Sequence, residues 1–179
     1  LNEQGVKKLA LLGHSRGGNQ AAWLVSEQAP NGLEKLILVA PATWSEADAA
    51  NDYQSRYAQD LAVVVKQAQS LSAEGKADQL MDVAGFVYCE KAKASANAVL
   101  GYYQADSRFN TPSLLTKISL PTLVITASED TVVKDLPAQL QKMQQKNQQI
   151  VTIDGADHFF LDLYTDELIE KVIEFIDWK

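Results

Sequence analysis

Residues 9–18 read Leu-Ala-Leu-Leu-Gly-His-Ser-Arg-Gly-Gly, and this stretch predicts the local structure on both of its sides. Residues 7–12 are mostly apolar and are typical of a strand, whereas residues 15–29 have the character of a helix. Ser15 therefore stands at a sharp turn from strand to helix, between Gly13 and Gly17. At such a turn a side chain is raised out of the sheet and can be approached from solvent.

The pattern Gly-x-Ser-x-Gly, here residues 13–17, is typical of a nucleophile elbow. The alternative is a glycine-rich turn whose serine takes part in no chemistry. The expected strand before the motif and the expected helix after it favour the elbow, because a nucleophile elbow requires that context. Ser15 is therefore the candidate nucleophile.

The composition is that of an ordinary globular domain. The chain has 179 residues, 46% of them apolar and 22% charged, which is enough for one domain with a real core. Its net charge of −7 and the lack of a basic run argue against nucleic acid as a ligand. The longest apolar runs are too short to span a bilayer. The single cysteine, Cys89, allows no disulfide within the chain and leaves the compartment undetermined.

Four strands are expected, and they predict the fold class. They cover residues 7–12, 33–40, 120–128 and 149–153, and their consecutive apolar positions indicate parallel strands that are covered on both faces. Helices are expected at residues 15–29, around 136–143 and at 161–178. The sequence therefore predicts an α/β fold, with a mostly parallel sheet between helices, built from residues 1–42 and 117–179.

Residues 43–116 show no convincing strand and are predicted to form a helical insertion. One apolar stripe at steps of three and four predicts a helix of some six turns, through Ala50, Tyr53, Tyr57, Leu61, Val64, Ala68 and Leu71. Further helices are expected at about residues 76–86 and 90–103, and a loop at 106–112.

A serine nucleophile needs a base, and the chain offers two histidines. His14 adjoins Ser15 on the turn, where successive side chains diverge, so it is badly placed to accept the serine proton. His158 follows the last expected strand, on the carboxyl edge of the sheet that also carries Ser15. His158 is therefore the candidate base, and an ordinary surface histidine is the alternative.

The base in turn needs a carboxylate to orient it. Asp130 ends the third expected strand, in a turn where it can face the loop that holds His158. Glu129 is its chief rival. Asp154 reads as a turn former before Gly155, and the neighbour of His158 in sequence, Asp157, is poorly aimed at its ring.

These three sites together make the chain resemble the C-terminal part of an α/β-hydrolase. Gly13–Gly17 matches the nucleophile elbow, Ala127–Asp130 matches the loop that carries the acid, and Gly155–His158 matches the histidine loop. The order serine, aspartate, histidine is also that of the family. The insertion stands where many members carry a helical cap.

The resemblance implies parts that lie outside these residues. The sheet of the family usually has eight strands and the elbow strand is the fifth, so the N-terminal strands are missing and an upstream half of the hydrolase domain is expected. The backbone N–H of Arg16 matches one oxyanion donor, whereas the second comes from a loop after the third strand.

The activity implied is that of a serine hydrolase on a small-molecule carboxylic ester or thioester, with no cofactor and no metal. The expected substrate contacts are His14, Trp44 and Tyr102. The same residue set also serves peptide and C–C bond hydrolysis. A non-catalytic ligand-binding protein on the same scaffold, or an inactive fragment, is the alternative.

Overall fold

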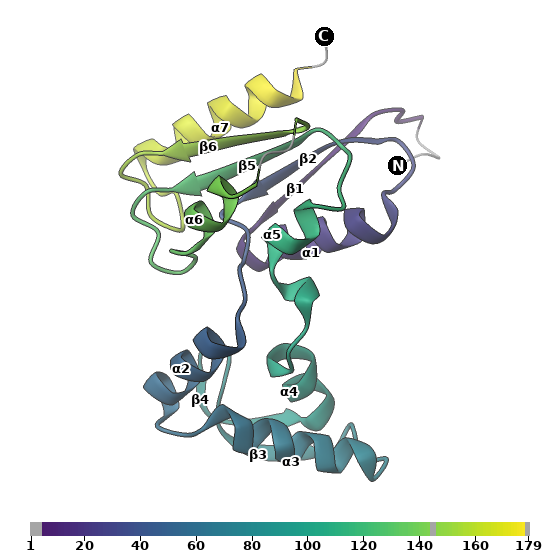
Figure 1. Ribbon diagram of the computed structural model, residues 1–179, viewed down its shortest axis with the longest axis vertical. Coiled ribbons are helices and arrows are strands. Elements are labelled where there is room, and N and C mark those ends of the chain that lie inside the picture. Colours follow the sequence, from purple (N-terminus) through teal and green to yellow (C-terminus); the bar gives the residue numbers. More distant parts are fainter. Residues whose placement is uncertain (1–4, 144–145, 178–179) are drawn as a thin grey trace. The chain divides into compact units, whose positions relative to one another are not determined.

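A computed structural model describes residues 5–143 and 146–177 (Figure 1). The chain divides into two compact units. The first unit comprises Leu1–Thr43 with Ser107–Lys179, and the second comprises Trp44–Asp106. Among the described residues, none of the helices has the length and apolar character needed to cross a membrane.

The first unit is built on a parallel sheet of four strands in the order β1-β2-β5-β6. This confirms the strands expected from the sequence, with small shifts of their ends. Strands β2 and β5 lie in the middle, and almost every side chain of theirs is buried, which explains their unbroken apolar runs. The strands are β1 (Leu9–His14), β2 (Leu33–Val39), β5 (Thr122–Ala127) and β6 (Gln148–Ile153).

Helices cover both faces of this sheet. Figure 1 shows α7 (Leu163–Ile176) on one face, and α1 (Ser15–Gln28), α5 (Thr111–Leu115) and α6 (Leu136–Gln141) on the other. Helix α1 begins at Ser15 as expected, and Ala22 on its inner face is fully buried. The last helix begins two residues later than expected, and the expected end at Trp178 lies outside the described residues.

The second unit contains three helices and a β-hairpin. Strands β3 and β4 pair antiparallel, and Met81 and Val83 point into the small core of this unit. The elements are α2 (Glu46–Tyr57), α3 (Leu61–Ala73), β3 (Leu80–Phe86), β4 (Cys89–Ser95) and α4 (Ala96–Tyr103).

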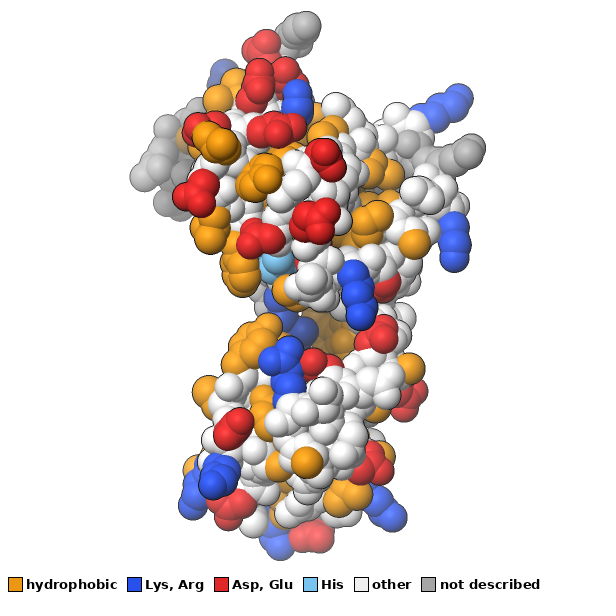
Figure 2. All heavy atoms as spheres, turned by 90° about the vertical axis from the view of Figure 1, so that its left-hand side faces the viewer, with side chains coloured by type: hydrophobic (Ala, Val, Ile, Leu, Met, Phe, Trp, Pro, Cys, Tyr) orange, Lys and Arg blue, Asp and Glu red, His pale blue; other side chains and the backbone are white. Residues whose placement is uncertain are grey.

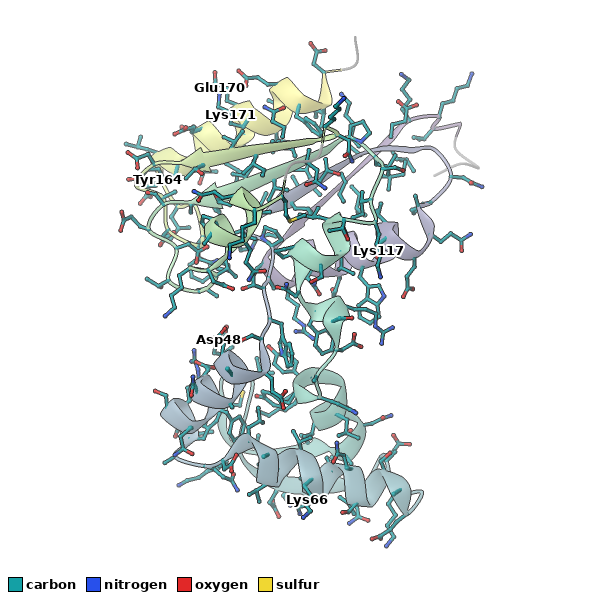
Figure 3. The ribbon with its side chains drawn as sticks, viewed as in Figure 1. Asp48, Lys66, Lys117, Tyr164, Glu170 and Lys171 are labelled. Carbon is teal, nitrogen blue, oxygen red and sulfur yellow. The ribbon has the colours of Figure 1, made fainter. Side chains whose placement is uncertain are left out.

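The expectation of one long helix in this unit was wrong. The apolar stripe is real, but the helix is interrupted between Tyr57 and Leu61. Ala58 takes a left-handed conformation with φ of 52°, and the carboxylate of Asp60 accepts a hydrogen bond from Ala62 N–H, which caps a new helix. At the start of α2, Ser45 and Asp48 form the corresponding cap. Figure 3 labels Asp48 in the first turn of this helix.

The expectation of a purely helical insertion was also wrong, because residues 80–95 form the hairpin. Its second strand reads Cys-Glu-Lys-Ala-Lys-Ala-Ser, and alanine, lysine and glutamate favour helices locally. Pairing with β3 and burial of alternate side chains override that local preference. The expected loop at residues 106–112 instead holds a short 3₁₀-helix, Ser107–Phe109, and the start of α5, whose Leu114 and Leu115 are buried in the core of the first unit.

Candidate active site

Ser15 lies at the junction of β1 and α1, where the backbone turns sharply. Its φ of 53° is in the left-handed region, which is uncommon for a residue with a side chain. The Ala42 N–H donates a hydrogen bond to the Ser15 carbonyl, with 2.9 Å between the two atoms. A strained residue of this kind costs on the order of 1–3 kcal/mol and persists only where its surroundings hold it.

Close backbone contacts explain the glycines on either side of the serine. A Cβ on Gly13 would lie 2.4 Å from the carbonyl oxygen of Gly17, and a Cβ on Gly18 would lie 2.9 Å from that of Gly13. A Cβ on Gly17 would meet nothing within 4 Å. The turn therefore requires glycine at positions 13 and 18, whereas the sequence pattern had pointed to positions 13 and 17.

His158 contacts Ser15 from the loop between β6 and α7. Its Nε2 lies 2.9 Å from the Ser15 Oγ. The histidine is buried, with 5% of its surface exposed, whereas Ser15 is partly exposed. The structure therefore brings the candidate base within hydrogen-bond reach of the candidate nucleophile.

Asp130 contacts the other nitrogen of the same ring. Its Oδ2 lies 2.8 Å from His158 Nδ1, and its Oδ1 accepts hydrogen bonds from the N–H groups of Val132 (2.7 Å) and Val133 (2.9 Å). Three donors therefore hold this carboxylate in place. Since a carboxylate accepts at Oδ2, Nδ1 of His158 carries the proton and Nε2 is left to accept one from Ser15.

The other candidate carboxylates do not contact the His158 ring. Glu129 and Asp154 are exposed, and Glu129 contributes its backbone N–H to the Ala156 carbonyl at 2.9 Å. Asp157 accepts hydrogen bonds from the N–H groups of Phe159 and Phe160, which closes a local turn after the histidine.

The loop before His158 is tightly held. Gly155 N–H donates to the hydroxyl of Ser128 at 2.7 Å, and a Cβ on Gly155 would lie 2.6 Å from the Tyr164 hydroxyl. Tyr164 lies at the beginning of α7 (Figure 3). Contacts with Ser128, directly after β5, and with Tyr164 of α7 therefore restrict this loop.

The remaining expected residues fall into three places. His14 ends β1, and its Nε2 lies 2.8 Å from the backbone oxygen of His158. Arg16 is the second residue of α1, among the N–H groups that have no acceptor within the helix, and its guanidinium lies 5.0 Å from the centre of the Phe109 ring. Trp44 and Tyr102 belong to the second unit, and their role as substrate contacts stays a prediction.

Tyr102 takes part in an aromatic cluster of the second unit, with ring centres 5.6 Å from Phe86 and 4.9 Å from Tyr103. Tyr57 belongs to the same cluster through Tyr53. Two tyrosine hydroxyls of the cluster form hydrogen bonds with Val87, in the turn between β3 and β4. Tyr57 donates to the Val87 carbonyl at 2.7 Å, and Tyr103 accepts from Val87 N–H at 2.9 Å. Burial raises the pKa of Tyr103 to about 12.

Surface charge and metal ligands bear on what the molecule binds. Acidic side chains are scattered over the face of the first unit in Figure 2, and α7 contributes Asp166, Glu167, Glu170 and Glu174. Across residues 5–143 and 146–177, no group of three or more His, Cys, Asp and Glu side chains is arranged to hold a metal ion.

A family model described as serine aminopeptidase, S33, matches residues 1–162. The chain belongs to this α/β-hydrolase family. The family confirms the resemblance read from the three motifs, and it places the protein among hydrolases. A comparison with curated proteins finds no significant match.

Several solved structures share the fold of this chain. The chain aligns with a bromoperoxidase from Bacillus anthracis at a TM-score of 0.59 and 18% identity, over 99% of this chain and 70% of that one. A hydrolase from Pseudomonas aeruginosa PA01 gives 0.58 and 22%, over 99% and 68%. A monoacylglycerol lipase from Paleococcus ferrophilus gives 0.58 and 14%, over 97% and 69%. These likenesses confirm the expected fold class.

Proposed function

We propose that this protein is a serine hydrolase that cleaves a carboxylic ester or thioester of a small molecule through an acyl-enzyme. The observation that carries the proposal is the hydrogen-bonded chain from Ser15 through His158 to Asp130, with distances of 2.9 Å and 2.8 Å. A serine hydroxyl is a weak nucleophile by itself, and this arrangement supplies both a base and a group that orients the base.

The proposed reaction has two halves. Ser15 Oγ attacks the acyl carbon while His158 Nε2 takes its proton, and the resulting imidazolium is stabilised by Asp130. His158 then gives the proton to the leaving alcohol or thiol as the bond to the acyl carbon breaks. Water, activated by the same histidine, attacks the acyl-enzyme and releases the acid. The backbone N–H of Arg16 donates a hydrogen bond to the carbonyl oxygen and so stabilises the negative charge that develops there.

Surface charge guides the choice of substrates for a first screen. The net charge of −7 repels anionic molecules at long range, so neutral acyl esters are the substrates of choice. The monoacylglycerol lipase among the structural neighbours supports including esters of different acyl length. Trp44 and Tyr102 are the proposed substrate contacts, and their aromatic rings suit an apolar acyl group.

Aminopeptidase activity is a second candidate, because the matching family model carries that description. The same chain of side chains would serve amide hydrolysis, in which His158 protonates an amine as it leaves. A peptidase would cleave amino-acid p-nitroanilides, whereas the esterase proposed here cleaves p-nitrophenyl esters and acyl thioesters in preference.

Rates on these three substrate classes test the proposal, with Ser15→Ala as the control. The expected result is ester and thioester hydrolysis that depends on Ser15 and exceeds the rate on the anilides. Preference for the anilides would favour the peptidase. Hydrolysis that persists in Ser15→Ala would overturn the proposed mechanism.

A further inference from the structure

We propose that His14 is a positioning residue, which holds the backbone of His158 in place beside the nucleophile. This inference rests on the proposed function. Its basis is the hydrogen bond of 2.8 Å between His14 Nε2 and the carbonyl oxygen of His158, two residues that are 144 positions apart in the sequence. The bond joins the residue directly before Ser15 to the residue that activates Ser15.

The chemistry of the two groups fixes the direction of this bond. A carbonyl oxygen can only accept, so His14 Nε2 must carry a proton and donate it. Nε2 carries that proton in one neutral tautomer and also in the imidazolium ion, so the bond persists in both states. The same proton excludes His14 Nε2 as an acceptor for the proton of Ser15, which separates the roles of the two histidines.

The position of the bond suggests why it matters. On its other side the His158 loop is fastened to the end of β5, through Ser128, the Glu129 N–H and the Asp130 carboxylate. On the nucleophile side, the direct link is the bond between His158 and Ser15, which is broken when the serine proton is transferred. The bond from His14 involves neither of the atoms that exchange the proton, so it stays intact during that step. It therefore holds the His158 backbone at a fixed distance from the end of β1 while the acyl group is bound.

Ring packing adds to this bond without replacing it. The ring centres of His14 and His158 lie 4.9 Å apart at 46°, and Phe159 packs edge-on against His158 at 5.3 Å. A phenyl ring at position 14 would keep most of this packing and lose the N–H donor. A glutamine would lose the ring and keep an N–H donor at a similar reach.

The matched pair His14→Phe and His14→Gln separates these contributions. With p-nitrophenyl butyrate, we expect His14→Phe to lower kcat on the order of 10- to 100-fold, because even a small displacement of a catalytic base strongly lowers the rate of the chemical step. KM should stay within about twofold, since ground-state binding is not removed. We expect His14→Gln to keep kcat within about threefold of the wild-type value, because the carbonyl keeps its donor. An unchanged kcat in His14→Phe, or an equal fall in both variants, would overturn the inference.

A spectroscopic readout keeps this test separate from the test of the proposed function. In a Ser15→Ala background, the downfield ¹H resonance of His158 Nδ1–H reports its hydrogen bond to Asp130. We expect His14→Gln to preserve this resonance and His14→Phe to shift or broaden it. If the protein cleaves no ester but the two variants differ in this way, the proposed function fails and the positioning role stands. A resonance that is the same in both variants contradicts the positioning role, whatever the activity.

Discussion

His158 Nδ1 lies 2.8 Å from the Oδ2 atom of Asp130, and backbone N–H groups hold the other oxygen of that carboxylate at 2.7 Å and 2.9 Å. The carboxylate is therefore fixed before any substrate binds. Because its side chain is almost fully buried, water does not compete for these bonds. The proposed function makes this fixed carboxylate the group that sets the tautomer of the base.

Replacing Asp130 by Asn tests that role. The amide keeps the shape of the side chain but can present N–H to the ring, which favours the wrong tautomer of His158. We expect kcat for ester hydrolysis to fall by about 10⁴-fold, the effect of this change in a serine protease. The control is Glu129→Gln, an exposed neighbour without a contact to the ring, which should leave kcat nearly unchanged. A larger loss in Glu129→Gln would mean that the wrong carboxylate has been assigned.

The two glycines of the sequence motif should respond in opposite directions to alanine. At position 13 a Cβ would lie 2.4 Å from a backbone oxygen, so Gly13→Ala should lower the free energy of unfolding by about 1–3 kcal/mol. At position 17 the space is open and the residue is helical, so Gly17→Ala should raise it by about 0.5–1 kcal/mol. Urea unfolding measures both. Equal destabilisation by the two changes would contradict this view of the turn.

A buried amide connects α1 to the segments that flank the second unit in sequence. Asn19 donates to the Arg108 carbonyl at 2.9 Å and to the Thr111 hydroxyl at 3.2 Å, and Thr111 donates to the Ala42 carbonyl. Asn19→Asp would replace these donors by a carboxylate facing a carbonyl oxygen. We expect the free energy of unfolding to fall by about 1–3 kcal/mol. The matched control is Gln20→Glu on the exposed side of the helix, which adds the same charge and should change stability little.

The second unit should lose stability at alkaline pH. Burial raises the pKa of Tyr103 to about 12, and it also raises the pKa values of Tyr53 and Tyr57. An unfolded chain releases these phenol protons near pH 10, before the folded unit does, so the stabilisation is complete below about pH 10 and is lost as the pH rises toward 12. Absorbance at 295 nm follows the phenolates, and Tyr103→Phe should remove the late phase. Tyr88→Phe, at an exposed position, should leave that phase in place. A late phase that survives Tyr103→Phe would assign it to another tyrosine.

The sequence was sufficient to predict the sheet and the meeting of Ser15, Asp130 and His158, because both follow from the geometry of parallel strands. Parallel strands end at a common edge, so residues that follow different strands meet there, as Ser15, Asp130 and His158 do. The long apolar runs of β2 and β5 then identified the strands themselves.

The unpredicted features depend on contacts between distant residues. The hairpin at residues 80–95 has local helix formers in its second strand, and pairing across the strands determines its structure. The break between α2 and α3 leaves the apolar stripe in phase, so periodicity did not reveal it. The bond from His14 to the His158 carbonyl involves the backbone, which carries no sequence signal.

The most direct test of the proposed mechanism is covalent labelling of the protein with a fluorophosphonate, followed by peptide mass spectrometry. A serine activated by a neighbouring histidine attacks this reagent, whereas an ordinary surface serine does not. We predict one adduct, located on Ser15, that is abolished in Ser15→Ala and strongly slowed in Asp130→Asn. Absence of an adduct on Ser15 in the folded protein, or labelling that persists in Ser15→Ala, would contradict the account.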